Sequence, residues 1–269
     1  MLTPRILYGT AWKELQTEPL VRQAIAEGFR GIDTACQPKH YHEPGVGAAV
    51  AACLSEGMRR EQLFLQTKFT SVNGHDPARI PYDPNAPLPQ QVAQSFSMSL
   101  RNLQTTYVDS LVLHSPMPRP EQTLEVWRAM EGLVDSGGTK QIGISNCYRL
   151  DVLASLHAAS RIKPAVVQNR FYAETDYDTE IRAFCRANGM VYQSFWTLSA
   201  NPHLLADETL RLLGLKYRCT PAQVLFRYLT LNGVVPLTGT RSREHMREDL
   251  AIFDFVLTET ELRAITALL

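Results

Sequence analysis

The chain has 269 residues, 45% of them apolar, and equal numbers of basic and acidic residues, 27 of each. Zero net charge argues against non-specific nucleic-acid binding, which needs a basic surface. The apolar residues are enough to fill a large core, which excludes wholesale disorder. Five scattered cysteines, an odd number without a CxxC pair, exclude a disulfide framework and a zinc ribbon.

Eight short apolar runs, rich in β-branched residues, predict strands along the whole chain. They lie at 6–8, 31–34, 63–68, 111–114, 141–145, 166–169, 191–195 and 234–237. Stretches of helical period separate the runs, as at 124–134, where Leu124, Trp127 and Met130 share one face. Strands that alternate with helices indicate parallel βαβ units, and eight units predict a single (β/α)8 TIM barrel over residues 1–269.

Local signals place two helix starts and one irregular segment. Thr220 precedes Pro221 and Gln223, and Thr258 precedes Glu261 in the same capping-box spacing. Residues 70–89 are rich in Pro, Asn, Asp and Gly and follow the third predicted strand. We expect this long loop on the face of the barrel where active sites form.

Three polar residues end consecutive predicted strands. Asp33 ends the second, Lys68 the third and His114 the fourth. Each has an ordinary alternative, because an aspartate can cap a turn, a lysine can extend its amine to solvent, and a histidine can be satisfied in a core. Since a barrel brings these strand ends to one mouth, the three together predict a site.

Several longer motifs resemble the aldo-keto reductases in order and spacing. They are GIDTA (31–35), TK (67–68), SLRNLQTTYVDSLVLHSP (99–116), IGISN (142–146), VVQNRFY (166–172) and FWTL (195–198). The family is a (β/α)8 barrel that uses NAD(P)H to reduce aldehydes and ketones. The resemblance implies a catalytic tetrad of Asp33, Tyr41, Lys68 and His114.

Carbonyl reduction explains why such a set is needed. Hydride arriving at carbon leaves charge on oxygen, which needs a proton and hydrogen-bond donors. A phenol has a reference pKa of about 10, so we expect Lys68 to lower the pKa of Tyr41 and Asp33 to keep Lys68 charged. Tyr41 is then the proton relay and His114 the donor to the substrate oxygen.

The tyrosine segment departs from the family pattern. The usual position, five residues after Asp33, is occupied by Pro38, and Glu43 and the residues after it stand two places later than usual. An insertion therefore precedes Tyr41. One of its neighbours, Lys39, His40 or His42, is the alternative to Tyr41 as the residue that enters the site. A solvated loop and a metal site remain alternatives for residues 40–43, although a metal needs further ligands from elsewhere.

No GxGxxG fingerprint follows the first predicted strand, so a Rossmann dinucleotide-binding fold is not indicated. The expected cofactor contacts are those that the family resemblance implies. Phe195 is expected to stack on the nicotinamide, with amide and hydroxyl groups holding its carboxamide and backbone groups approaching the ribose and pyrophosphate. The residues implied are Ser145, Asn146 and Gln168 at the carboxamide, Thr197 and Leu198 at the pyrophosphate, and Gly9 and Thr10 at the ribose. For Gly9 and Thr10 an ordinary strand-ending turn is the alternative.

The adenosine end differs more from the family. Gly239 stands where a lysine is common and His245 where an arginine is common, whereas Thr240 keeps a hydroxyl near an expected helix N-terminus. Arg241 is the candidate replacement cation for the 2′-phosphate, or else an ordinary solvated charge. Asp249, with its neighbour at 248, is expected at the adenine. NADPH is therefore expected rather than NADH.

The resemblance also indicates an open substrate mouth, because the chain has neither the N-terminal hairpin nor the long C-terminal loop of many relatives. Trp12, Phe69, Ser115 and Trp196 are the expected pocket walls, which favour an apolar or aromatic carbonyl compound. We expect a cytoplasmic monomer without metal, membrane or nucleic-acid partners, since the N-terminus has no signal-peptide pattern. The alternatives are a nucleotide-binding barrel with little turnover and a metal-dependent hydrolase.

Overall fold

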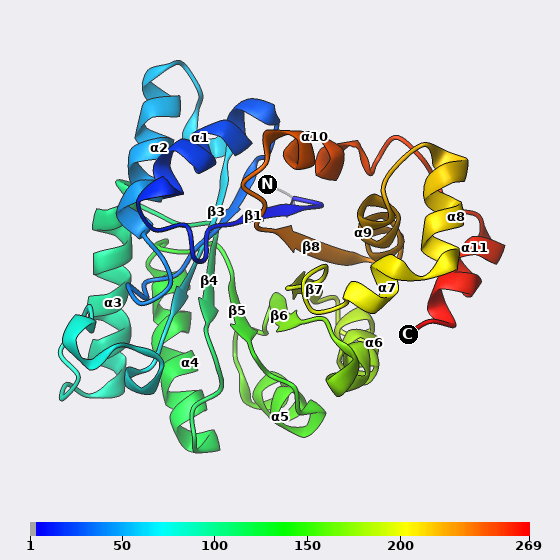
Figure 1. Ribbon diagram of the computed structural model, residues 1–269. Coiled ribbons are helices and arrows are strands. Elements are labelled where there is room, and N and C mark those ends of the chain that lie inside the picture. The colour runs from blue at the N-terminus through cyan, green and yellow to red at the C-terminus, as the bar shows by residue number, and fades with distance from the viewer. Residues whose placement is uncertain (1–3) are drawn as a thin grey trace.

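The computed structural model describes residues 4–269, in which eight parallel strands form a closed barrel with helices around it (Figure 1). The strands are β1 (Leu7–Gly9), β2 (Gly31–Asp33), β3 (Phe64–Phe69), β4 (Ser110–Leu113), β5 (Ile142–Ser145), β6 (Val166–Arg170), β7 (Val191–Phe195) and β8 (Val234–Thr238). Their order in the barrel follows the chain, and β8 closes on β1 by pairing Leu237 with Leu7. The predicted (β/α)8 barrel is confirmed.

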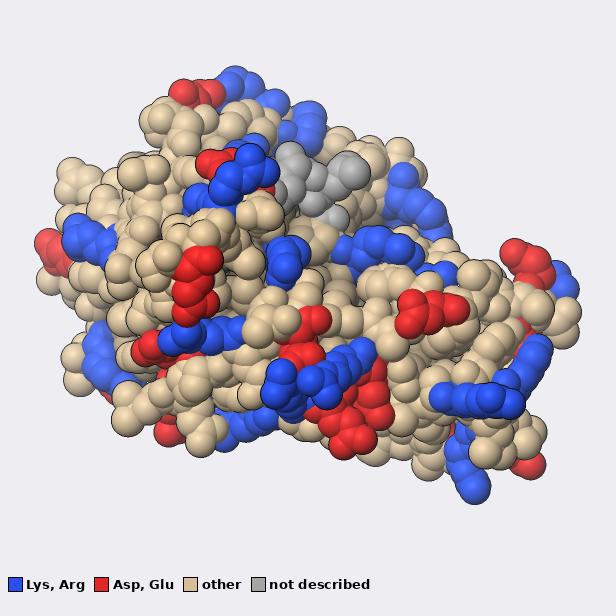
Figure 2. Space-filling model, turned by 90° about the horizontal axis from the view of Figure 1, so that it is seen from above, with Lys and Arg blue, Asp and Glu red and all other residues tan. Residues whose placement is uncertain are grey.

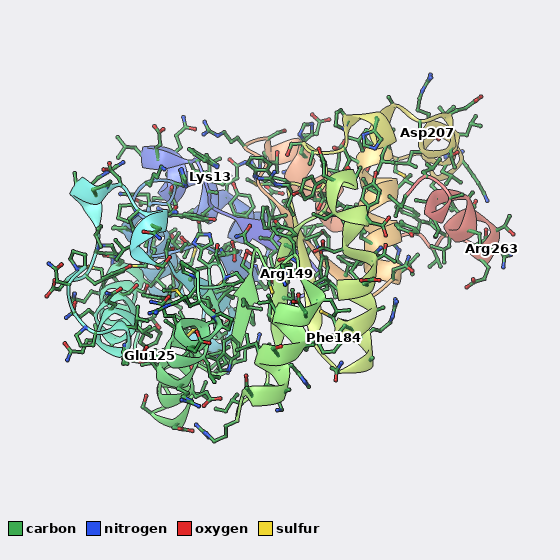
Figure 3. All side chains as sticks on the ribbon, turned by 90° about the horizontal axis from the view of Figure 1, so that it is seen from below. Lys13, Glu125, Arg149, Phe184, Asp207 and Arg263 are labelled. Atoms are coloured by element: carbon green, nitrogen blue, oxygen red, sulfur yellow. The ribbon has the colours of Figure 1, made fainter. Side chains whose placement is uncertain are left out.

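Helices connect successive strands, with extra ones around β8. They are α1 (Thr17–Glu27), α2 (Glu43–Ser55), α3 (Leu88–Leu103), α4 (Pro120–Asp135), α5 (Leu150–Ala159), α6 (Thr179–Ala187), α7 (Pro202–Ala206), α8 (Glu208–Tyr217), α9 (Pro221–Leu231), α10 (Arg243–Ala251) and α11 (Glu259–Thr266). Figure 1 shows α1–α3 on one side of the barrel and α7–α9 with α11 on the other. Figure 3, viewed from below, labels Glu125 of α4, Phe184 of α6 and Arg263 of α11 at separate places around the molecule.

The local predictions agree closely with the observed elements. The run 191–195 is β7 itself, and the capping boxes at Thr220 and Thr258 are both formed. His114 lies one residue beyond β4, which ends at Leu113. The segment 70–89 is more ordered than expected, because the Thr70 carbonyl oxygen accepts hydrogen bonds from Tyr82 Oη (2.7 Å) and His75 Nε2 (3.0 Å).

The inside of the barrel is polar where apolar strand residues were expected. Gln66, Gln168 and Gln193 are buried and hydrogen-bonded to one another, with Gln66 Nε2 donating to Gln193 Oε1 at 2.7 Å and Gln168 Nε2 at 2.9 Å. Both Gln66 and Gln168 also donate to Asp33 Oδ1, at 2.8 and 3.0 Å. These hydrogen bonds offset the penalty of burying the amide groups and fix the position of the Asp33 carboxylate.

The surface carries charges of both signs. Figure 2 shows basic and acidic side chains interspersed on the face seen from above. No helix within residues 4–269 has both the length and the apolar character that a bilayer crossing requires.

Candidate active site

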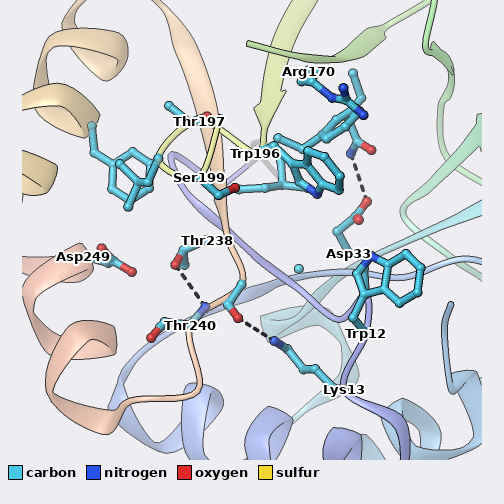
Figure 4. Close-up of a pocket in the computed structure, with 18 of the residues that line it drawn as sticks. Trp12, Lys13, Asp33, Arg170, Trp196, Thr197, Ser199, Thr238, Thr240 and Asp249 are labelled. Atoms are coloured by element: carbon cyan, nitrogen blue, oxygen red, sulfur yellow. Dashed lines mark hydrogen bonds between the residues drawn. The ribbon is translucent and has the colours of Figure 1, made fainter. Parts of the chain in front are cut away.

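A cavity of about 870 Å³ opens at the carboxyl ends of the strands. Residues at or just beyond the ends of every strand except β3 line it, together with the first turns of α9 and part of α10. Its volume is typical of small-molecule sites. Figure 4 shows Asp249 at one end of this cavity and Arg170 with Asp33 at the other, with Lys13 along one wall.

A buried ion pair lies at the base of the cavity. Lys68 Nζ is 2.6 Å from Asp33 Oδ2 and donates to the Thr34 carbonyl oxygen at 2.8 Å. The side chains of Lys68 and Asp33 are only 1% and 3% exposed. Burial lowers the pKa of the Lys68 amine, and the Asp33 carboxylate opposes this shift.

The inserted segment brings Tyr41 into the cavity. Residues 38–40 form a turn in which the Gln37 carbonyl oxygen accepts from the backbone amides of His40 (3.1 Å) and Tyr41 (3.0 Å). Lys68 Nζ lies 5.2 Å from the centre of the Tyr41 ring, and the His114 ring centre lies 6.0 Å from it. Asp33, Tyr41, Lys68 and His114 are therefore brought together, although Lys68 lies behind the cavity surface.

The pKa of Tyr41 shifts opposite to expectation. Burial, followed by the charge of Asp33, raises the pKa of the phenol above its ordinary value. The expected lowering by Lys68 is wrong because burial of the phenol dominates, and Asp33 pairs with the Lys68 ammonium at 2.6 Å. Tyr41 is consequently a protonated phenol at neutral pH.

His114 is held as a neutral ring. Burial, and then the charge of Lys68, lowers its pKa well below the ordinary value. Its Nδ1 lies 2.6 Å from Thr70 Oγ1, so Thr70 fixes the orientation of the ring. The sequence reasoning missed Thr70, whose only visible signal was its place two residues after Lys68.

One wall carries the residues expected at a nicotinamide. Ser145, Asn146, Gln168 and Phe195 all line the cavity. Asn146 Nδ2 donates to the His114 carbonyl oxygen at 2.8 Å, and Ser145 Oγ to the Gln168 carbonyl oxygen at 2.6 Å. This wall is rigid because its polar groups are tied to neighbouring strands.

The other end of the cavity is lined by residues expected at the pyrophosphate and adenosine. These are Thr197, Leu198, Thr240, Arg241, His245 and Asp249, and Gly9, expected at the ribose, also lines the cavity. Burial raises the pKa of Asp249 to about 6. Arg243 and Arg247 pair with Glu27, whereas Arg241 has no carboxylate partner within residues 4–269. Within residues 4–269, Arg241 is therefore the one of these three arginines that lines the cavity without a counter-charge, its guanidinium donating only to the Trp12 carbonyl oxygen and Gln16 Oε1.

Besides Lys68, three expected site residues do not line the cavity. Thr10 is buried behind it, where its Oγ1 donates to the Asp33 carbonyl oxygen at 2.9 Å. Phe69 packs in the core against Tyr82, because a strand's side chains alternate and that of Lys68 points inward. Ser115 is exposed outside the cavity, and its Oγ donates to the His114 carbonyl oxygen. Trp12 and Trp196 do line the cavity, as expected.

Lys13 is a cavity residue that the sequence reasoning missed. Its side chain is buried, its Nζ donates to the Gly239 carbonyl oxygen at 2.7 Å, and the amine lies 3.9 Å from where a side chain at position 239 would begin. Burial, followed by the charge of Arg241, lowers its pKa to about 8. A lysine in the loop directly after the first strand was the available signal.

His40 and Arg170 also line the cavity without having been predicted as site residues. His40 packs against Trp12 with ring centres 3.9 Å apart and ring planes tilted by 41°, so it enters the site beside Tyr41 rather than in its place. The guanidinium of Arg170 lies over the Trp196 ring, 4.2 Å from its centre. Within residues 4–269, no group of three His, Cys, Asp or Glu side chains is placed so that it could hold a metal ion.

Comparisons with known proteins agree with this geometry. A model of the aldo/keto reductase family matches residues 7–269. Glyoxal reductase from Bacillus subtilis (strain 168) is 30% identical over 249 residues, covering 92% of this chain and 82% of that protein.

Solved structures give the same result. An aldo/keto reductase from Brucella melitensis superposes with a TM-score of 0.82 at 30% identity, covering 98% of this chain and 94% of the other. A Bombyx mori aldo-keto reductase in complex with NADP has a TM-score of 0.82 at 25% identity, covering 98% and 89%. The barrel, the converged polar residues and the family match over nearly the whole chain show that this protein belongs to the aldo/keto reductase family.

Proposed function

We propose that this protein is an NADPH-dependent reductase that converts an aldehyde or ketone to the corresponding alcohol. The observation that carries the proposal is the convergence of Tyr41, His114 and the Lys68–Asp33 pair at one point of the cavity. The B. subtilis relative is named a glyoxal reductase, and the B. mori relative was solved with NADP, which supports both the reaction and the cofactor.

Bound NADPH would supply a hydride to the carbonyl carbon. The electron pair of the broken C=O π bond moves to oxygen, which takes the proton of the Tyr41 hydroxyl, so the carbonyl is reduced and the nucleotide oxidised. The raised pKa of Tyr41 keeps this proton in place until charge develops on the oxygen. Neutral His114 donates from Nε2 to the same oxygen, provided that Thr70 Oγ1 donates to Nδ1.

The cavity residues fit a phosphorylated dinucleotide. Phe195 offers a flat ring between strand ends that carry amide and hydroxyl groups. Lys13 is a buried cation bonded to a carbonyl oxygen, with Arg241 as a second cation and no carboxylate paired with either within residues 4–269. Two adjacent cations without a counter-charge are suited to a phosphate, and Lys13 stands where position 239 lacks a side chain.

The direct test is the absorbance loss of NADPH, and separately of NADH, with a panel of aldehydes and ketones. We expect turnover with NADPH and a higher Kd for NADH. Tight NADPH binding without turnover on any carbonyl would favour the runner-up, a nucleotide-binding barrel, for which the intact cofactor wall is the supporting observation.

Replacing Lys13 with Met should raise the Kd for NADPH about 10- to 100-fold, because a charge-assisted hydrogen bond to phosphate contributes about 1.5–3 kcal/mol. Titration calorimetry without carbonyl substrate measures this directly. Lys216→Met, which removes an exposed charge on α8, is the control and should leave the Kd unchanged. Equal affinity of the Lys13 variant and the wild type would remove Lys13 from the phosphate site.

Replacing Thr70 with Val should lower kcat about 5-fold, because it removes one hydrogen bond, worth roughly 1 kcal/mol, that orients His114. NADPH affinity should not change, since Thr70 does not line the cavity. Thr70→Ser keeps the hydroxyl and should restore most of the activity. A Ser variant as slow as the Val variant would show that the hydroxyl is not the relevant group.

A further inference from the structure

Arg170 is a cation at the end of the cavity far from Asp249 (Figure 4). It is the last residue of β6 and faces the same way as Gln168, because side chains two apart on a strand share a face. Its register partner on the neighbouring strand β7 is Phe195. Arg170 therefore stands at the mouth above Gln168 and beside the expected nicotinamide platform.

The guanidinium is held by aromatic rings rather than by a carboxylate. Its central carbon lies 4.2 Å from the centre of the Trp196 ring and 5.0 Å from that of Tyr172. Within residues 4–269 the Arg170 guanidinium has no ion pair and no hydrogen bond, and its Nε is buried without a partner. Stacking on aromatic faces leaves the N–H edge of a guanidinium available for in-plane, two-pronged binding of a carboxylate.

Trp196 reinforces this arrangement through its backbone. Its φ of 55° lies in the left-handed region, which a tryptophan seldom adopts. Such strain persists where surrounding structure imposes it and is concentrated at functional sites. Here it directs a large ring against Arg170 while about half of the tryptophan remains exposed.

The other charges near this end of the cavity do not compete for the same group. Asp33 is paired with Lys68, and the lowered pKa of His114 leaves that ring neutral. Lys13 and Arg241 lie along the wall toward Asp249, where the nucleotide phosphates are expected. Arg170 is thus a cation on the substrate side that has no ion-pair partner among residues 4–269.

The spacing suits a small bifunctional molecule. His114 follows β4 and Arg170 ends β6, two strands away, which separates their backbones by roughly 10 Å. Side chains from both positions extend into the cavity. One aromatic ring, or a chain of four to six carbons, can join a carbonyl at His114 to an anion at Arg170.

We propose that Arg170 binds a carboxylate of the substrate, so that the carbonyl compound reduced is an oxo acid. This inference rests on the proposed reductase function and adds the substrate class to it. A neutral carbonyl compound of the same shape would lose the two-pronged contact and be a poorer substrate.

The test compares two aldehydes that differ only in charge, 4-carboxybenzaldehyde and 4-formylbenzamide. We expect the wild type to have a KM for the carboxylate about 10- to 100-fold below that for the amide. Arg170→Met should abolish this ratio by raising the KM of the carboxylate alone, with kcat little changed, and Arg170→Lys should retain part of it. Arg186→Met removes an exposed charge from α6 and should leave the ratio intact.

Binding of 4-carbamoylbenzoate, which cannot be reduced, gives a second measurement by calorimetry. If both aldehydes were reduced and the ratio of their KM values were the same in the wild type and in Arg170→Met, the inference would be overturned and the reductase function would stand. Arg170-dependent binding of 4-carbamoylbenzoate without turnover of either aldehyde would support the anion site and refute the reductase function. If an aldehyde that carries a phosphate group, and not the aldehyde that carries a carboxylate, showed the Arg170-dependent decrease in KM, the assignment to oxo acids would be overturned.

Discussion

Replacing Tyr41 with Phe should lower kcat for carbonyl reduction about 100- to 10,000-fold, the usual contribution of a positioned general acid. The substitution removes only the hydroxyl, and with it the proton that the alkoxide oxygen would receive. Because the Lys68–Asp33 pair and His114 remain, NADPH binding should be unchanged. Stopped-flow measurement of NADPH oxidation under single-turnover conditions isolates this step from product release.

A comparison with His40 tests whether Tyr41 is the residue that supplies the proton. His40→Gln removes the imidazole that packs against Trp12 beside Tyr41. We expect it to alter KM more than kcat, because His40 lines the wall of the cavity. Undiminished turnover by Tyr41→Phe together with a large loss of kcat in His40→Gln would transfer the proton relay to His40. The insertion before Tyr41 makes this comparison necessary.

Replacing Asp33 with Asn should destabilise the protein by about 3–5 kcal/mol, the usual effect of leaving one partner of a buried ion pair without its counter-charge. Lys68 is 1% exposed and has no other carboxylate within hydrogen-bonding distance in residues 4–269. Loss of the Asp33 charge would also lower the pKa of the Lys68 amine further, since burial already lowers it and Asp33 opposes that shift. Urea unfolding, followed by circular dichroism, measures the change.

Asp76→Asn is the matched control, because Asp76 pairs with Arg79 in an exposed position and Asn retains the cap to Ala78. We expect it to change stability by less than about 0.5 kcal/mol. The double variant Asp33→Asn with Lys68→Met should recover part of the lost stability, since no buried charge then remains unpaired. Wild-type stability in Asp33→Asn alone would contradict a functional ion pair at the base of the cavity.

The expectation that Lys68 would lower the pKa of Tyr41 illustrates a limit of sequence reasoning. Motif spacing indicated that an amine and a phenol would meet, and they do, at 5.2 Å from the ring centre. The direction of the pKa shift depends on burial and on the net charge of the Lys68–Asp33 pair, which only the assembled site defines. The same is true of Phe69, whose place in the core follows from its register next to Lys68.

The sequence by itself determined the barrel, the family resemblance and most residues of the cavity, because strand periodicity and capping are local and the motifs keep their order along the chain. Tertiary structure alone decided that the turn at 38–40 delivers Tyr41, that Lys13 reaches Gly239 after the neighbouring strand β8, and that Trp196 holds Arg170 at the mouth. Each of these depends on contacts between segments that are distant in the chain or on side-chain direction, neither of which is encoded in a local pattern.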